Sequence, residues 1–151
     1  MKQVAIDTGV WVEAISRGSE FYSLARRIIN EVLAGKIKAV ITSLTATEVY
    51  YVAYRVYRAS GLDSFKAKTR ALNLFNVLYT HDNIEVLINR EISLRAAEIK
   101  IKYNIALSDS YILSIAKILG IPVIFRHPEK EMVPNLSNLK KEFKIIFLSE
   151  I

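Results

Sequence analysis

Short, largely apolar segments alternate with longer amphipathic segments along this chain, and this alternation limits the folds that the chain can adopt. The short segments at 4–6 and 37–41 have the composition expected of strands buried in a sheet. The longer segments repeat their apolar residues with the period of a helix. Strands that alternate with helices predict a parallel sheet with right-handed crossover connections, and therefore an α/β fold.

The sequence predicts five strands and five main helices within one domain spanning residues 1–151. We find no internal repeat, low-complexity segment or linker, and this length is sufficient to bury a hydrophobic core. The least regular segment is 127–139. We therefore expect a central, mostly parallel sheet flanked by helices, with strands at 4–6, 37–41, 84–88, 122–125 and 144–148 and helices at 21–33, 46–57, 64–79, 91–103 and 108–119.

Acidic residues recur where these predicted strands end or where helices begin. Asp7 directly follows the first strand, Glu48 lies just past the second, and Asp109 opens the helix before the fourth. Glu129 and Glu131 follow that fourth strand. Parallel strands end at one edge of a sheet, where open α/β folds bind their ligands. Converging carboxylates repel one another unless a cation holds them, and their oxygens suit Mg²⁺ or Mn²⁺.

Each acidic residue also has a structural explanation. Asp7 could cap the turn that follows it. Glu48 could complete a capping box with Thr45, in which each side chain bonds a backbone amide of the other residue. Asp109 follows a potential N-cap at Ser108 and could stabilise the positive end of its helix. The two later glutamates could be solvated loop charges. Convergence at one edge of the sheet favours the functional interpretation.

The chain is basic overall, although its proposed site is acidic. It contains 21 Lys and Arg against 15 Asp and Glu, a formal net charge of +6. Basic residues around an acidic pocket would hold a polyanion such as a nucleic acid. The alternative is a surface charge that only maintains solubility. The absence of cysteine excludes disulfides and thiolate metal sites.

Residues 55–70 concentrate positive charge against the single acid Asp63, and we expect them to contact substrate. Nearby tyrosines could stack on unpaired RNA bases. Their spacing of three, four and seven residues also suits the buried face of a helix, and we favour core or interface for Tyr50 and Tyr57. The expected RNA contacts are therefore the basic residues Arg55, Arg58, Lys66, Lys68 and Arg70, rather than the tyrosines at 50, 51, 54 and 57.

The order of these motifs resembles that of the PIN-domain ribonucleases, and most closely that of the VapC-type toxins of toxin–antitoxin systems. Asp7-Thr8 resembles the family's Asp-Ser/Thr at the end of its first strand. The segment from Thr42-Ser43 to Glu48 resembles the one carrying the second acid. Ala97 and the segment 105–113, with Asp109, resemble the third acidic motif. The resemblance covers essentially the whole chain.

The fourth acidic position departs from the family's pattern. PIN domains usually follow the fourth strand with Thr-x-Asp. Here Phe125 occupies the hydroxyl position and His127 the position of the Asp. We expect Glu129 to supply the missing carboxylate, because its longer side chain could reach the site from further along the loop. Glu131 is the competing candidate.

The resemblance implies a metal-dependent endoribonuclease that hydrolyses RNA phosphodiester bonds. Asp7, Glu48 and Asp109 would hold one or two Mg²⁺ or Mn²⁺ ions, and Glu129 would complete the catalytic set. Thr8 and Ser43 would position water, substrate or a carboxylate. The resemblance also implies a small antitoxin protein as partner, and we expect a homodimer. With no signal peptide or membrane span in the sequence, we expect a cytoplasmic protein that does not contact the membrane.

Other functions are also compatible with parts of the sequence. The departure at His127 would suit a catalytically weakened PIN-like module that binds RNA or a protein. A phosphatase forming an aspartyl-phosphate would need a second Asp two residues after Asp7, but Gly9 stands there. A ribosomal-RNA maturation nuclease of the kind that resembles this chain plus a zinc ribbon is excluded by the absence of cysteine.

Overall fold

The five strands form one parallel sheet with the order β3-β2-β1-β4-β5. A computed structural model describes all residues from 1 to 151. It confirms the predicted α/β class and makes the sheet parallel throughout. Every predicted strand is present, with ends shifted by one or two residues. Their bounds are β1 Lys2–Ile6, β2 Ile37–Thr42, β3 Ile84–Leu87, β4 Val123–Phe125 and β5 Ile145–Phe147.

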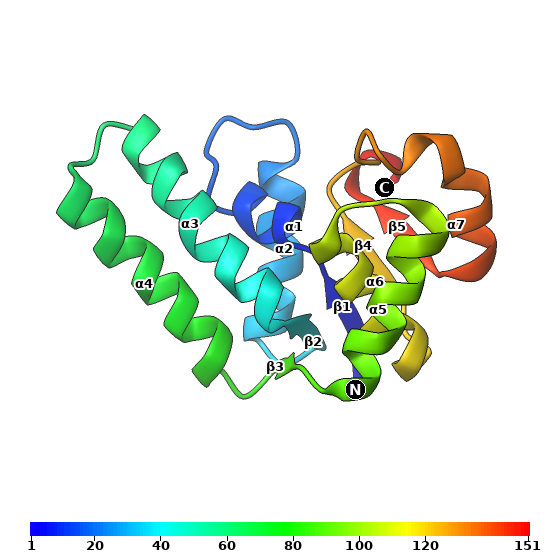
Figure 1. Cartoon of the computed structure of the whole chain (residues 1–151). Coiled ribbons are helices and arrows are strands. Elements are labelled where there is room, and N and C mark those ends of the chain that lie inside the picture. The colour runs from blue at the N-terminus through cyan, green and yellow to red at the C-terminus, as the bar shows by residue number, and fades with distance from the viewer.

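Helices flank the sheet, and all five predicted helices are present (Figure 1). Two further helices, α1 and α7, were not predicted. None of the helices combines the length and the apolar character needed to cross a membrane. Their bounds are α1 Thr8–Glu13, α2 Tyr22–Leu33, α3 Ser43–Ala59, α4 Ser64–Thr80, α5 Arg90–Tyr103, α6 Leu107–Leu119 and α7 Leu136–Glu142, with short 3₁₀ segments at Val133–Asn135 and Leu148–Glu150.

Two hydrophobic clusters cover the two faces of the sheet. Because side chains alternate along a strand, Val4 and Ile6 of β1 belong to one cluster and Ala5 belongs to the other. The first cluster includes buried residues of α2 and α3. The second includes buried residues of α5 and α6. This two-sided burial explains why the strands are apolar on both faces.

The middle strand β1 determines where a site can form. It pairs with β2 on one side and with β4 on the other. From β1 the chain first adds strands on one side of the sheet and then on the other, so the strand order reverses at β1. Open α/β sheets bind ligands at the carboxyl edge of such a switch point. Asp7 leaves the strand at this edge, and its backbone N–H donates to the carbonyl of Ile124 at 3.0 Å.

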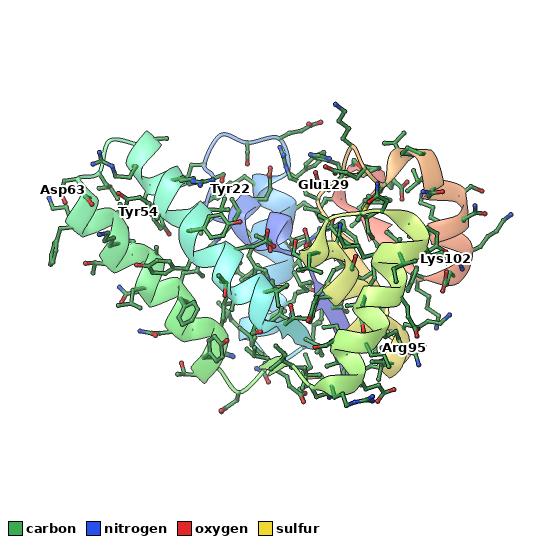
Figure 2. All side chains as sticks on the ribbon, in the orientation of Figure 1. Tyr22, Tyr54, Asp63, Arg95, Lys102 and Glu129 are labelled. Atoms are coloured by element: carbon green, nitrogen blue, oxygen red, sulfur yellow. The ribbon has the colours of Figure 1, made fainter.

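Helices α3 and α4 form a long antiparallel hairpin at one side of the molecule, on the left of Figure 1. Tyr50 packs edge-on against Phe75, with ring centroids 6.0 Å apart, and the Tyr54 hydroxyl lies 3.2 Å from the Ser64 hydroxyl. Tyr50 therefore packs between the two helices, as its spacing predicted. Figure 2 shows Tyr54 and Asp63 on this hairpin, well separated from Glu129.

Helix α3 begins three residues earlier than predicted, which changes its N-cap. Thr42, the last residue of β2, is fully buried, and its hydroxyl oxygen accepts the backbone N–H of Thr45 at 3.2 Å. Thr45 lies inside the helix, so the capping box considered for Thr45 and Glu48 is wrong. Ser108 is likewise not an N-cap, because α6 begins at Leu107 after Ala106.

We expect Thr42→Ala to lower the free energy of unfolding by about 1 kcal/mol, because the buried cap of α3 is lost. Thr47→Ala is the matched control. Thr47 is exposed on the same helix, and its hydroxyl bonds only the carbonyl of Ser43. Urea unfolding of the three proteins would measure the difference. An equal cost at both positions would contradict the importance of this cap.

Candidate functional site

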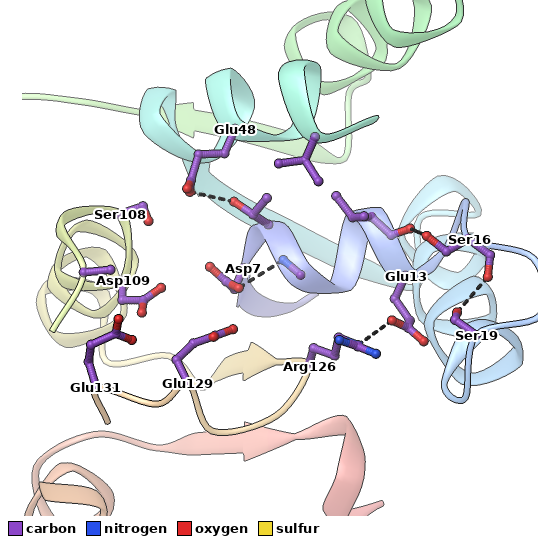
Figure 3. A pocket seen from close by; sticks show the side chains of 15 residues that line it. Asp7, Glu13, Ser16, Ser19, Glu48, Ser108, Asp109, Arg126, Glu129 and Glu131 are labelled. Atoms are coloured by element: carbon purple, nitrogen blue, oxygen red, sulfur yellow. Dashed lines mark hydrogen bonds and ion pairs between the residues drawn. The ribbon is translucent and has the colours of Figure 1, made fainter. Parts of the chain in front are cut away.

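A cavity of about 500 Å³ opens at the carboxyl edge of the sheet, next to the end of β1. It is lined by 15 residues, of which only three are hydrophobic. All of the acidic residues singled out in the sequence line it, together with one more, Glu13 at the end of α1 (Figure 3). The carboxylates around this cavity are Asp7, Glu13, Glu48, Asp109, Glu129 and Glu131.

Asp7 is buried and caps α1. Its Oδ2 accepts the backbone N–H of Gly9 at 3.0 Å. The considered turn-capping role is therefore real, yet the side chain also lines the cavity. The pKa of Asp7 is raised from 3.8 to about 7, mainly by burial and also by the negative charges of Glu48 and Glu129, while backbone hydrogen bonds act in the opposite direction. Asp7 therefore both caps α1 and contributes a carboxyl group to the cavity.

Asp109 lies in the first turn of α6 and is also buried. Its Oδ2 is buried without any hydrogen-bond partner. The pKa of Asp109 is raised from 3.8 to about 8, mainly by burial and also by the nearby charges of Asp7 and Glu129. A buried acceptor left without a partner costs free energy. The helix terminus alone therefore does not account for this carboxylate, whereas a cation would satisfy it.

Glu48 points from α3 toward the cavity and is held there by hydrogen bonds (Figure 3). Its Oε1 accepts the hydroxyl of Thr8 at 3.0 Å, and its Oε2 lies 3.5 Å from the hydroxyl of Tyr51. The first bond connects α1 to α3 across the cavity wall. It holds the carboxylate of Glu48 next to the residue that follows Asp7.

The loop after β4 brings glutamates, and not its histidine, to the cavity. Glu129 and Glu131 line the cavity, while His127 does not. The Nε2 of His127 lies 3.2 Å from Arg126 Nη1, and its Nδ1 lies 3.1 Å from the carbonyl of Pro128. Arginine can only donate, so Nε2 accepts and Nδ1 carries the proton that bonds Pro128. The lone pair of the imidazole is thereby occupied by Arg126.

The expected substrate contacts fall into two groups. Thr8 lines the acidic cavity, and Ser43 lines a neighbouring hollow that also includes Glu48 and Ser108. The five expected basic contacts are exposed on the α3–α4 hairpin and line neither. Some of them stack on tyrosines, as Arg55 does on the ring of Tyr51 at 5.1 Å. The sequence predicted that these five residues contact substrate, and the structure places them on the hairpin, outside both cavities.

Sequence reasoning missed the part of the cavity formed by α1 and the loop that follows it. Glu13 is almost fully buried, and its carboxylate accepts the backbone N–H of Phe21 at 2.8 Å. Arg126 Nε lies 2.5 Å from Glu13 Oε2, a close ion pair without the alignment of a hydrogen bond. Ser16 and Ser19 complete this end of the cavity. An Asp7 N-cap could have signalled the start of α1, but nothing in the sequence pairs Glu13 with Arg126.

The donor set suits a hard divalent cation. Asp7, Glu48 and Asp109 offer carboxylate oxygens from three different elements, and Asp109 Oδ2 has no other partner. No three carboxylate or imidazole side chains are grouped closely enough to hold an ion as they stand. Mutual repulsion favours such a separation in the absence of a cation. The residue types therefore fit a metal centre, with side-chain adjustment on binding.

Comparisons with known proteins agree with this architecture. The PIN domain family matches residues 4–127. No curated protein matches the chain. Among solved structures, a chain of a toxin–antitoxin complex from Klebsiella pneumoniae superposes with a TM-score of 0.63 at 17% identity, covering 98% of this chain and 99% of that one.

Two other solved structures are similar in fold. The Mycobacterium tuberculosis toxin VapC20, described as cleaving the sarcin–ricin loop, has a TM-score of 0.62 at 14% identity over 80% of this chain and 86% of its own. A chain of the FitAcB structure from Neisseria gonorrhoeae has a TM-score of 0.61 at 15% identity over 98% and 99%. At sequence identities this low, the similarity shows a shared fold and nothing more.

The raised pKa values predict that the metal-free protein loses stability as the pH rises. Between about pH 4 and about pH 8, the folded state holds protons on Asp7 and Asp109 that the unfolded state has released. The free energy of unfolding should therefore fall across this range. Asp109→Asn should reduce the fall and stabilise the protein at pH 8 by on the order of 1–3 kcal/mol.

Urea unfolding in EDTA at several pH values would measure this effect. Asp82→Asn is the matched control, because Asp82 is exposed in a turn away from the cavity. A purely helix-stabilising Asp109 would give the opposite sign, with a loss of about 0.3–1 kcal/mol on neutralisation. An Asp109→Asn protein that is less stable than wild type at every pH would therefore contradict the proposed repulsion.

Proposed function

Because the chain belongs to the PIN domain family, we propose that it is a metal-dependent endoribonuclease that hydrolyses RNA phosphodiester bonds. The observation that carries this proposal is the convergence of carboxylates on one cavity at the switch point of the sheet. Asp109 supports it most directly, since its buried Oδ2 has no partner within the protein. The function is a hydrolase reaction that relies on acidic side chains rather than on a covalent nucleophile.

The metal ligands in this proposal are Asp7, Glu48 and Asp109, and the ions are one or two Mg²⁺ or Mn²⁺. A divalent cation there would supply an activated water and neutralise charge that develops on the phosphate. The protein's own contribution is orientation. The N–H of Gly9 fixes the carboxylate of Asp7, and the hydroxyl of Thr8 fixes that of Glu48.

Glu129 is proposed as the fourth acidic group. It lines the cavity, and its charge raises the pKa of both Asp7 and Asp109. Glu131 also lines the cavity, and its charge raises the pKa of Asp109 less than the charge of Glu129 does. His127 is bonded to Arg126 and Pro128 and does not line the cavity. These placements favour Glu129 over both competitors.

RNA is the proposed substrate, and the basic surface supports it. The net charge of +6 would attract a polyanion to a site whose own cavity is acidic. Thr8 and Ser43 are proposed as contacts beside the carboxylates. Binding of more distant nucleotides is proposed for the exposed basic residues of the α3–α4 hairpin, namely Arg55, Arg58, Lys66, Lys68 and Arg70.

We further propose that the protein is the cytoplasmic toxin of a toxin–antitoxin pair. Support comes from the descriptions of its structural neighbours, which include a toxin–antitoxin complex and a toxin. A small antitoxin protein would be the partner. A homodimer is supported by Phe65, Leu72 and Tyr79, which are exposed at seven-residue spacing on α4 and therefore share one helix face.

A catalytically weakened module that binds RNA or a protein is the second candidate. Two observations favour it: His127 stands where the family has an Asp, and no three potential ligands are grouped around one point. Cleavage assays separate the two candidates, because both would bind RNA and only the nuclease would cut it.

We expect Asp7→Asn to reduce RNA cleavage by about 100-fold or more, since an amide is a far poorer ligand for Mg²⁺ than a carboxylate. Cleavage of single-stranded RNA in Mg²⁺, in Mn²⁺ and in EDTA would measure this. Added Mn²⁺ should also raise the melting temperature of wild type more than that of Asp7→Asn, which provides a readout independent of activity. Undiminished cleavage in EDTA would disprove the metal requirement.

The fourth acidic group can be identified by comparing three variants at limiting Mn²⁺. We expect Glu129→Gln to lose activity by about tenfold, because a carboxylate near the metal is neutralised. Glu131→Gln and His127→Ala should lose less. Comparison of initial cleavage rates against wild type provides the measurement. If Glu129→Gln matches wild type while His127→Ala is inactive, the loop supplies a nitrogen ligand instead.

A further inference from the structure

Arg126 is the only basic residue among the 15 that line the cavity. Six carboxylates surround the same space, and they repel the phosphates of any nucleic acid that enters it. Cations bound at the acidic end would offset part of this repulsion. Arg126 is the one positively charged side chain among the lining residues that would attract a phosphate there.

The guanidinium of Arg126 is held from two sides. Its Nε lies 2.5 Å from Glu13 Oε2, and its Nη1 donates to His127 Nε2 at 3.2 Å. Glu13 is only 3% exposed and is itself fixed by the N–H of Phe21. A side chain held in this way loses little rotamer freedom when it binds a ligand.

Donors remain free on the same guanidinium. Its Nη2 has no partner within the protein, and the side chain of Arg126 is 37% exposed. The planar fork of arginine matches the oxygens of a phosphate. The ion pair with Glu13 therefore occupies one part of the guanidinium and leaves another part available to substrate.

Gly9 gives Arg126 room to adopt this position. A Cβ at Gly9 would lie 3.2 Å from the Cβ of Arg126, which is tighter than ordinary contacts. Figure 3 shows Arg126 between the two ends of the cavity, with Asp7, Glu48, Asp109, Glu129 and Glu131 toward one end and Glu13, Ser16 and Ser19 toward the other. A chain of phosphates that reached the acidic end from the other side would pass this guanidinium.

We propose that Arg126 binds a non-bridging phosphate oxygen of the RNA and that Glu13 is the residue that positions it. The proposal rests on the proposed function, since it takes RNA as the substrate. It also assigns a role to the departure of this loop from the family's pattern. His127 replaces an acid at that position and, as a hydrogen-bond acceptor, orients Arg126.

A purely structural role is the competing explanation. Arg126 could serve only to neutralise the buried Glu13, because a buried carboxylate without its partner is strongly destabilising. For the same reason, Arg126→Met alone would leave Glu13 unpaired and destabilise the fold. The double variant Glu13→Gln/Arg126→Met removes both charges, and the amide carbonyl introduced in place of the carboxylate can still accept the N–H of Phe21.

The test is binding of a short fluorescein-labelled oligouridylate in EDTA, measured by fluorescence anisotropy over a series of salt concentrations. Wild type, Glu13→Gln, the double variant and Arg90→Met are compared. Arg90 is an exposed arginine at the start of α5 that lines neither the acidic cavity nor the hollow beside it, so its variant controls for the loss of one positive charge. Thermal melts establish that each protein is folded.

We expect the double variant to bind less tightly than Glu13→Gln by about tenfold, because a charged hydrogen bond is lost. The plot of log affinity against log salt should also become shallower by about 0.7, the value for one phosphate contact on a single strand. Arg90→Met should keep both the slope and the affinity of wild type. Glu13→Gln should keep the slope, because Arg126 still contacts the phosphate, but should bind less tightly than wild type, because the ion pair that positions Arg126 is lost. The proposal would be overturned if the double variant and Glu13→Gln had the same affinity and the same salt dependence of that affinity.

This experiment separates the inference from the proposed function. If binding depends on Arg126 but wild type does not cleave RNA in Mn²⁺, the phosphate contact stands and the nuclease proposal fails. If wild type cleaves RNA in Mn²⁺ and the double variant binds and cleaves equally well, the nuclease proposal stands and the role of Arg126 is wrong. Failure of wild type to bind the oligouridylate at any salt concentration would also overturn the role of Arg126.

Discussion

Burial of acidic groups close to one another at the end of β1 is the constraint that the rest of this fold has to offset. Asp7 and Asp109 are both buried, and each pKa is raised by burial and by neighbouring acids. Bringing such groups together raises the free energy of the folded state. Burial of apolar side chains on both faces of the parallel sheet offsets this cost.

Helix α1 connects the elements that surround the cavity, although it is only six residues long. Its first turn receives the cap from Asp7, Thr8 bonds Glu48 of α3, and Glu13 pairs with Arg126 after β4. Three contacts from one short helix therefore join β1, α3 and the loop after β4. Packing of the larger helices determines which residues surround the cavity, and the contacts of α1 determine how their side chains are oriented.

The sheet and the positions of Asp7, Glu48 and Asp109 could be predicted from sequence, because each acid lies beside an apolar strand or a helix start. Helix α1 could not, because six residues are too few to show a helical period. The cap of α3 was misplaced at Thr45 because Thr42 also ends a strand and serves both elements. The ion pair between Arg126 and Glu13 depends on tertiary packing, which cannot be predicted from a local sequence pattern.

The strand order has a consequence for how the protein is made. β1 lies between β2 and β4. One edge of β1, a strand made at the start of synthesis, therefore stays unpaired until β4, which begins at Val123, has been made. Until the ribosome has released the loop after β4, a nascent chain lacks both Arg126 and Glu129 and cannot enclose the cavity. The pocket therefore assembles late in synthesis, and a chain truncated before this loop would lack the residues that close it.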